Sequence, residues 1–192
     1  MILLSDYLIQ PKTKKAYGGR NMFDVFRNYY DEFLSALLEH IEISFIAIVT
    51  AIVLAIFVTI FLNFYKEFSH ITIYLFSLMY AIPSFALFAL LIPITGLGQT
   101  TAIIVLVIYA QYILVRTFLS GLSQVDKHVI EAAKAMGMTK WQILLKVQFP
   151  LAQKSFFAGL RLASTAIIAI ATIGAMINAG GLGVILFDGL RT

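Results

Sequence analysis

Two long runs without a charged side chain limit what this chain can fold into. Among its 192 residues, no Asp, Glu, Lys or Arg occurs between Glu67 and Arg116. A second such run lies between Arg161 and Asp188. Apolar runs longer than about 18 residues are typical of helices that span a bilayer. With 60% hydrophobic and 12% charged residues, the chain has more apolar surface than a soluble domain of this size can bury. The sequence therefore predicts an all-α integral membrane protein and excludes a soluble enzyme and a disordered chain.

The apolar runs predict four membrane-spanning helices within a transmembrane domain of residues 43–192. The expected spans cover about residues 43–65, 71–92, 102–119 and 156–178. Residues 1–42 are expected to form a separate polar and amphipathic segment. Apolar residues recur at three- and four-residue spacing over 23–42, which indicates a helix that lies in the membrane interface or packs on its own protein.

Proline and glycine interrupt two of these regions. Pro83 lies in the middle of the second expected span, which ends at Pro93. Because proline removes a backbone hydrogen bond, Pro83 either shapes a path for a solute or kinks a packed helix. Irregular backbone at membrane depth is tolerated only where it lines a cavity or is buried in protein. Candidate residues for an outer gate after the fourth span are therefore Asn178, Gly180, Gly181 and Gly183.

The polar interval of residues 120–155 determines the expected orientation. Between Arg116 and Arg161, five lysines accompany only two acidic residues. Since Lys and Arg concentrate on the cytoplasmic side of membrane proteins, this interval is expected in the cytoplasm. Three spans upstream then place residues 1–42 outside, although that segment carries five basic residues. Arg116, near one end of the third span, is expected to reach toward the headgroups.

Two short helices are expected within the cytoplasmic interval. Residues 129–136 favour a helix, and Gly137 supplies the left-handed conformation that ends it. Thr139 is a good N-cap for a second helix over 140–147, which Pro150 stops. Two short helices that meet at a glycine and expose lysines form a compact docking surface, whereas the alternative is a loop that only connects two spans.

Several kinds of chemistry are absent from the sequence. The chain has no Cys, and its three His are far apart without an HExxH motif, so a metal site is not expected. It has no GxxxxGK[ST] motif, so no ATP site, cofactor site or catalytic residue is expected in this chain. The net charge of +4 reports loop orientation rather than nucleic-acid binding.

The cytoplasmic interval resembles a known family. The pattern begins with Glu-Ala-Ala, has a Gly after three further residues, and ends in apolar-x-apolar-Pro. It resembles the cytoplasmic loop of permease subunits in binding-protein-dependent ABC importers. In this chain it is formed by Glu131, Ala132, Ala133, Gly137, Val147, Phe149 and Pro150. Four further stretches are similar to the osmoprotectant branch (glycine betaine, carnitine, choline), and they cover 81–87, 92–98, 121–126 and 178–183.

This resemblance implies the type I ABC importer permease fold, a helical bundle with a cytoplasmic coupling-helix loop. It implies a multi-pass subunit of the bacterial plasma (inner) membrane, surrounded by lipid, that forms half of a translocation pathway for quaternary-amine osmoprotectants. The implied partners are a cytoplasmic ABC ATPase dimer that binds ATP, an extracytoplasmic substrate-binding protein and a second permease subunit, either identical or similar. Family members normally continue with a further span after the 180–183 region, so the chain is expected to be either incomplete or a four-span variant.

The resemblance also assigns roles to side chains. Gly137 would set the angle of the coupling helices, and Glu131 would contact the ATPase or cap a helix. Lys134, Lys140 and Trp141 are candidate contacts with the ATPase. The alternative for the two lysines is that they are simply solvated. Four tyrosines are candidates to face a quaternary ammonium or, alternatively, to anchor the protein at the interface, and they are Tyr74, Tyr80, Tyr109 and Tyr112. Tyr80 and Pro83 join the outer-gate residues as possible pore positions.

Other functions remain open at this point. A permease for amino acids or related zwitterions would share the same architecture. A membrane scaffold that does not transport would use the same docking surface for another soluble partner, without any dependence on ATP. An intramembrane enzyme is disfavoured, because Lys66 and Glu67 are the only charged residues between Ile43 and Ile92.

Overall fold

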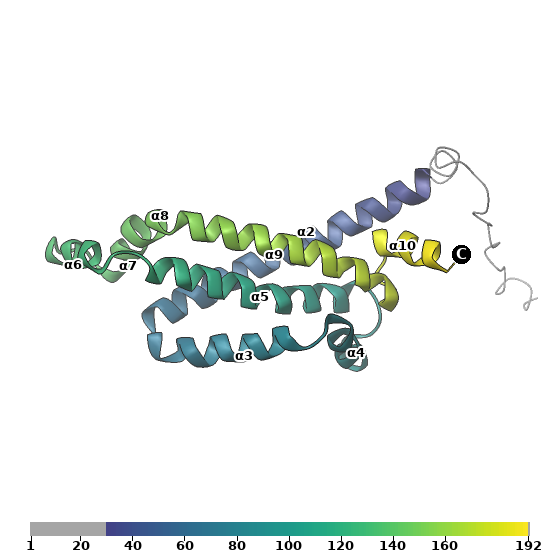
Figure 1. Cartoon of the computed structure of the whole chain (residues 1–192), viewed down its shortest axis with the longest axis horizontal. Coiled ribbons are helices and arrows are strands. Elements are labelled where there is room, and N and C mark those ends of the chain that lie inside the picture. Colours follow the sequence, from purple (N-terminus) through teal and green to yellow (C-terminus); the bar gives the residue numbers. More distant parts are fainter. Residues whose placement is uncertain (1–29, 192) are drawn as a thin grey trace, which may run out of the picture.

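The computed structural model describes residues 30–191, which form an elongated helical bundle without strands in that part of the chain (Figure 1). This confirms the expected all-α fold. The helices are α2 (Tyr30–Phe64), α3 (Ser69–Ala81), α4 (Ser84–Thr95), α5 (Gln99–Ser123), α6 (Lys127–Ala135), α7 (Lys140–Ile143), α8 (Phe149–Leu151), α9 (Gln153–Ile173) and α10 (Leu182–Leu190), joined in places by the short turns η1 (Lys66–Phe68), η2 (Leu144–Gln148) and η3 (Gly174–Ile177).

The first helix is longer than the expected span of 43–65. Helix α2 runs without interruption from Tyr30 to Phe64, so residues 30–42 belong to the same helix as the span and are not a separate segment. The physical reason is that this stretch contains neither Gly nor Pro, and nothing in it stops helix propagation. The remainder of the expected N-terminal segment, residues 1–29, lies outside the described residues.

The second expected span is wrong as a single helix. It divides into α3 and α4, which meet at an angle of 97°. Pro83 is the N-cap of α4, and Ile82 before it is extended, with a ψ of 130°. The residue before a proline avoids the helical region, so the chain turns at this point. Pro83 thus does more than kink a continuous helix.

Pro93 does not end the second span either. Helix α4 continues past it to Thr95. The hydroxyl of Thr95 donates to the Leu91 carbonyl at 2.9 Å, which adds a bond near the one that Pro93 cannot make. The helix ends at Gly96, whose N–H still donates to the Ile92 carbonyl at 2.8 Å.

Helix α5 is the centre of the bundle, packed against α2, α3, α4 and α9. Its contact with α2 follows a row of small residues four positions apart, Ala47, Ala51 and Ala55, all fully buried. Small residues let helix backbones approach closely in a membrane. Gln111 of α5 donates to the Ala51 carbonyl at 3.0 Å and joins the two helices.

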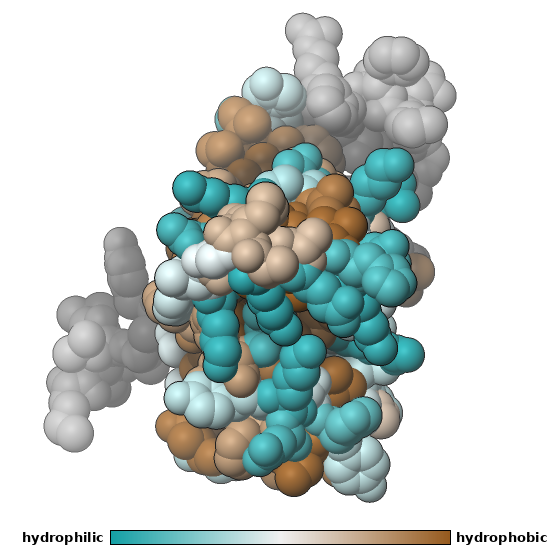
Figure 2. Space-filling view, turned by 90° about the vertical axis from the view of Figure 1, so that its left-hand side faces the viewer, coloured by the Kyte–Doolittle hydropathy of each residue, from teal (hydrophilic) through white to brown (hydrophobic). Residues whose placement is uncertain are grey.

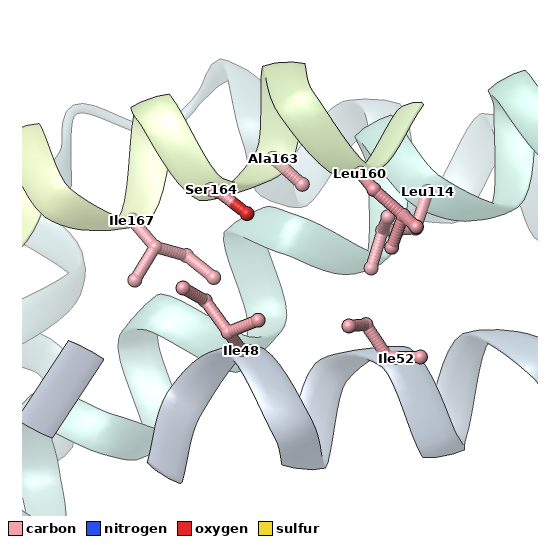
Figure 3. A pocket seen from close by; sticks show the side chains of 7 residues that line it. All are labelled: Ile48, Ile52, Leu114, Leu160, Ala163, Ser164 and Ile167. Carbon is pink, nitrogen blue, oxygen red and sulfur yellow. The ribbon is translucent and has the colours of Figure 1, made fainter. Parts of the chain in front are cut away.

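A small apolar hollow lies where α2, α5 and α9 meet (Figure 3). Side chains from all three helices point toward one another around it, and they belong to Ile48, Ile52, Leu114, Leu160, Ala163, Ser164 and Ile167. The space does not admit a water molecule. It is therefore part of the packed core rather than a binding site.

Three helices are long and apolar enough to cross a membrane, namely Tyr30–Phe64, Gln99–Ser123 and Gln153–Ile177, and a fourth span results if the bent pair α3–α4 counts as one. These helices give the molecule two distinct ends (Figure 1). Helices α6, α7 and α8 lie at one end. The start of α2, helix α4 and helix α10 lie at the other.

Candidate functional site

The short helices at one end of the bundle form a helical knob, defined as residues 126–151. Asp126 caps α6, because its side chain accepts the His128 N–H at 2.8 Å. Helix α6 ends where the Met138 N–H donates to the Ala133 carbonyl at 3.1 Å. Gly137 has a φ of 79°, a left-handed conformation that glycine adopts without strain. The expected helix end at Gly137 is confirmed.

Helix α7 begins with a complete capping box. The Thr139 hydroxyl accepts the Gln142 N–H at 3.3 Å, and the Gln142 side chain accepts the Thr139 N–H at 2.8 Å. This reciprocal pair satisfies two backbone groups that a helix start leaves open. It confirms Thr139 as the N-cap and holds α7 at a defined angle after Gly137.

Pro150 does not stop the second helix, contrary to expectation. The chain widens into the π-helical turn η2 and continues through α8 as far as Leu151. In this turn the Phe149 N–H donates to the Leu144 carbonyl five residues back. A wider turn accommodates the proline ring, which has no N–H and crowds the carbonyl four residues before it.

The knob is fastened to the spans by side chains of three helices. The Trp141 ring packs on Phe64 at the end of α2, with 4.8 Å between ring centroids. The Phe149 ring contacts Phe156 of α9 at 5.0 Å. A small buried cluster of Leu122, Leu144 and Ala152 connects the knob with α5 and α9. The knob is therefore in direct contact with α2, α5 and α9.

The outer surface of the knob is basic around exposed apolar side chains. Figure 2 shows hydrophilic side chains gathered over this end of the molecule, with apolar patches between them. The side chain of Met136 is 75% exposed, and Leu145 is also exposed. Exposed apolar residues with a polar rim are typical of protein interaction sites. The exposed basic residues are Lys127, Lys134, Lys140 and Lys146.

The motif residues differ in exposure. Glu131 is 70% exposed, and its carboxylate lies 3.9 Å from the His128 ring. It does not cap α6, because Asp126 does. Ala133 is buried, whereas Ala132, Phe149 and Pro150 are exposed and Val147 is half-buried. A Cβ placed on Gly137 would meet no heavy atom within 4 Å.

The expected gate residues lie at the opposite end, beside the first turns of α2. The Gly181 N–H donates to the Glu39 carboxylate at 3.0 Å, across 142 positions of sequence. Asn178, Gly180 and Gly181 all have positive φ. Gly183 packs so closely on α9 that a Cβ would lie 1.9 Å from the Thr172 carbonyl oxygen. No sequence signal indicated Glu39 or its neighbour His40 as partners of this turn.

A third group of expected residues meets near the α3–α4 break. Tyr80, Tyr109 and Tyr112 lie together, whereas Tyr74, on the same helix as Tyr80, lies outside this group. Arg116, which was expected at the headgroups and not at a binding site, joins this group, because its guanidinium lies 5.5 Å from the centre of the Tyr112 ring. The sequence could have indicated Arg116 as a candidate, because it is the only charged residue of α5.

Ligand-binding chemistry is sparse elsewhere in the described part of the chain. Residues 30–191 contain no group of three or more His, Cys, Asp or Glu that could hold a metal ion. A hollow of about 370 Å³ between α2 and α3 is almost wholly apolar. Its lining residues are Phe57, Val58, Phe61, Leu62, Thr72 and Phe76.

A family model described as "Binding-protein-dependent transport system inner membrane component" matches residues 47–192. The carnitine transport permease protein of Listeria monocytogenes is 38% identical over 153 residues, which cover 80% of this chain and 70% of that protein. The glycine betaine/carnitine/choline transport system permease protein of Bacillus subtilis (strain 168) is 34% identical over the same shares. The choline transport system permease protein of that strain is 33% identical, covering 83% of this chain and 74% of that protein.

A solved structure of the MetNI methionine ABC transporter has a similar helical arrangement. It superposes with a TM-score of 0.70, covering 80% of this chain and 77% of that one, at 24% identity. At this identity the likeness shows a shared fold.

Proposed function

The chain belongs to the binding-protein-dependent transport system inner membrane components, and we propose that it couples ATP hydrolysis by a partner to the import of small quaternary amines. As a member of this family it has the type I ABC importer permease fold and is a multi-pass inner-membrane subunit. A permease subunit is a transport component and is not itself an enzyme. The proposal concerns its substrate, its partners and the residues that couple them.

The helical knob is the single observation that supports coupling best. Helix α6 is capped at both ends and α7 at its start, the outer surface of the knob is apolar with a basic rim, and Trp141 and Phe149 join it to α2 and α9. A cytoplasmic ATPase dimer that binds ATP would dock on this surface. Closure of the dimer would then move the knob, and with it the spans. The proposed coupling residues are Glu131, Ala132, Ala133, Gly137, Val147, Phe149 and Pro150.

The substrate class is proposed from the named relatives. The similar permeases are named for carnitine, glycine betaine and choline, all of which carry a trimethylammonium group. These names favour quaternary amines over ordinary amino acids and over a scaffold that does not transport. An extracytoplasmic binding protein would deliver the solute, and a second permease subunit would supply the other half of the pathway.

The turn at the far end is proposed as part of the outer gate. Its residues Asn178, Gly180, Gly181 and Gly183 follow directly after the α9 span, and Glu39 ties the turn to α2. Movement of α9 would therefore change the position of this turn relative to α2. Pro83 and Tyr80 lie at the α3–α4 break, where we place a further part of the pathway.

The coupling proposal is tested at Gly137. A valine there must adopt a φ of 79°, which β-branched residues strongly disfavour, whereas asparagine tolerates it. Since a Cβ meets no atom within 4 Å, backbone conformation alone separates the two variants. We expect the ATPase activity that co-purifies with the tagged permease to fall at least about fivefold in Gly137→Val. The Gly137→Asn variant should keep most of this activity. Equal activity in both variants, or none with the wild type, would contradict the proposal.

A further inference from the structure

The tyrosines at the α3–α4 break form one cluster with Arg116. The Tyr80 ring lies 4.9 Å from the Tyr112 ring and 5.6 Å from the Tyr109 ring, between centroids. Tyr109 donates its hydroxyl to the Ile82 carbonyl, which the break leaves outside a helix. Tyr109 is buried, and Tyr80 is 40% exposed. The buried ring thus supports two rings that have accessible surface.

Arg116 points in an unexpected direction. It was expected to reach toward the headgroups at the knob end of α5, but its side chain turns back along the helix. One of its nitrogens donates to the Tyr112 hydroxyl, one turn nearer the middle of the span. Side chains in a helix lean toward its N-terminus, and α5 runs toward the knob. The side chain of Arg116 is exposed, and its guanidinium is held over the Tyr112 ring, one turn further into the span.

The charge of Arg116 has no acidic partner within residues 30–191, where the one contact within 4 Å between a basic and an acidic side chain joins the His128 ring and the Glu131 carboxylate. An ionisable side chain inside a membrane span is costly, and such residues mark substrate or ion pathways. The guanidinium donors are geometrically suited to a carboxylate, which they bind in a two-pronged manner. Apart from the bond to Tyr112, the guanidinium donors of Arg116 are therefore left for a carboxylate.

The aromatic surfaces suit the opposite charge. Tyrosine faces attract quaternary ammonium groups through the negative potential of the ring. The Tyr80 ring contacts the rings of both Tyr109 and Tyr112, so an ammonium would lie on the accessible face of Tyr80 rather than between the rings. An open surface of this kind holds a solute weakly, as a transport pathway requires.

We propose that Tyr80, Tyr112 and Arg116 form a transit site for zwitterionic quaternary amines, in which the Tyr80 ring binds the ammonium and Arg116, held by Tyr112, binds the carboxylate. This inference rests on the proposed function and specifies its substrate class. Glycine betaine and carnitine carry both groups. Choline carries the ammonium alone, so its charge is repelled by Arg116 without compensation.

The site is tested by ATP-dependent uptake in cells that express the permease with its ATPase and binding protein. The probes are labelled glycine betaine, carnitine and choline. We expect Arg116→Gln to lower the uptake of the two carboxylate solutes at least about tenfold, while choline uptake stays within about twofold of wild type or rises. Arg116→Lys keeps the charge without the two-pronged geometry, and we expect an intermediate loss.

The aromatic half is tested separately, so that a folding defect in one variant does not decide the result. Tyr80→Leu is expected to lower uptake of all three solutes about tenfold, whereas Tyr80→Phe keeps the ring face and stays within about twofold. Tyr74→Leu is the matched control, because Tyr74 is an exposed tyrosine of the same helix outside the cluster. Membrane levels of each variant are measured by immunoblotting.

Two kinds of failure are distinguishable. If wild type takes up none of the three solutes, the proposed function is overturned and the site with it. If wild type transports them but Arg116→Gln and Tyr80→Leu change nothing, only the site is overturned. An equal loss of choline and glycine betaine uptake in Arg116→Gln would overturn the carboxylate contact.

Discussion

Gly183 shows how one missing side chain positions a helix. It lies near the start of α10, where a Cβ would fall 1.9 Å from the Thr172 carbonyl oxygen and 2.8 Å from the Ala175 Cβ. A methyl group at this position forces α10 away from α9. We expect Gly183→Ala to cost about 1–3 kcal/mol, measured as a lower thermal unfolding midpoint of the purified complex. Gly189→Ala in the same helix is the control, because a Cβ there meets no heavy atom within 4 Å. Equal midpoints for the two variants would contradict this prediction.

Thr139 has a local role at the same scale. Its hydroxyl accepts the Gln142 N–H at the start of α7, and loss of such a cap costs about 1 kcal/mol. We expect Thr139→Ala to speed amide hydrogen exchange across residues 140–148 about fivefold, while Thr139→Ser exchanges like wild type. Unchanged exchange in Thr139→Ala would show that packing of Trp141 alone holds α7.

At the scale of elements, the small-residue row on α2 determines how closely α2 approaches α5. Ala51 is fully buried, and its carbonyl accepts the Gln111 side chain at 3.0 Å. A larger side chain at this position separates the helices and breaks that bond. We expect Ala51→Leu to destabilise the bundle by about 1–3 kcal/mol. The stability of both variants is measured as the thermal unfolding midpoint of the purified complex. Val53→Leu, on the exposed face of the same helix, should unfold at the wild-type midpoint. A comparable loss in both variants would point to α2 insertion rather than to the α2–α5 contact.

At the scale of the whole molecule, we expect the two ends of the bundle to lie on opposite sides of the membrane. The start of α2 lies at the end opposite the knob (Figure 1), and the lysines of the knob favour the cytoplasm. Because the chain contains no cysteine, single cysteines report position without background. We expect a membrane-impermeant maleimide to label Met136→Cys only in inside-out vesicles and Ser35→Cys only in right-side-out vesicles. Labelling of both from one side would contradict this topology.

The sequence by itself determined the features that depend on neighbouring residues. Uncharged runs indicated a membrane bundle, Gly137 and Thr139 indicated the ends of the knob helices, and the motif around Glu131 indicated an importer permease. These predictions were possible because hydropathy, caps and left-handed glycines act within a few residues. The long helix α2 was equally accessible, since residues 30–64 contain no helix breaker.

Only the tertiary structure decided the features that join distant residues. Pro83 alone did not reveal that α3 and α4 meet at 97°, because a proline permits both a kink and a break. The Glu39–Gly181 bond spans 142 positions, and the direction of Arg116 toward Tyr112 depends on rings that α3 brings to α5. Packing between helices determines such contacts, and no local pattern records which faces will meet.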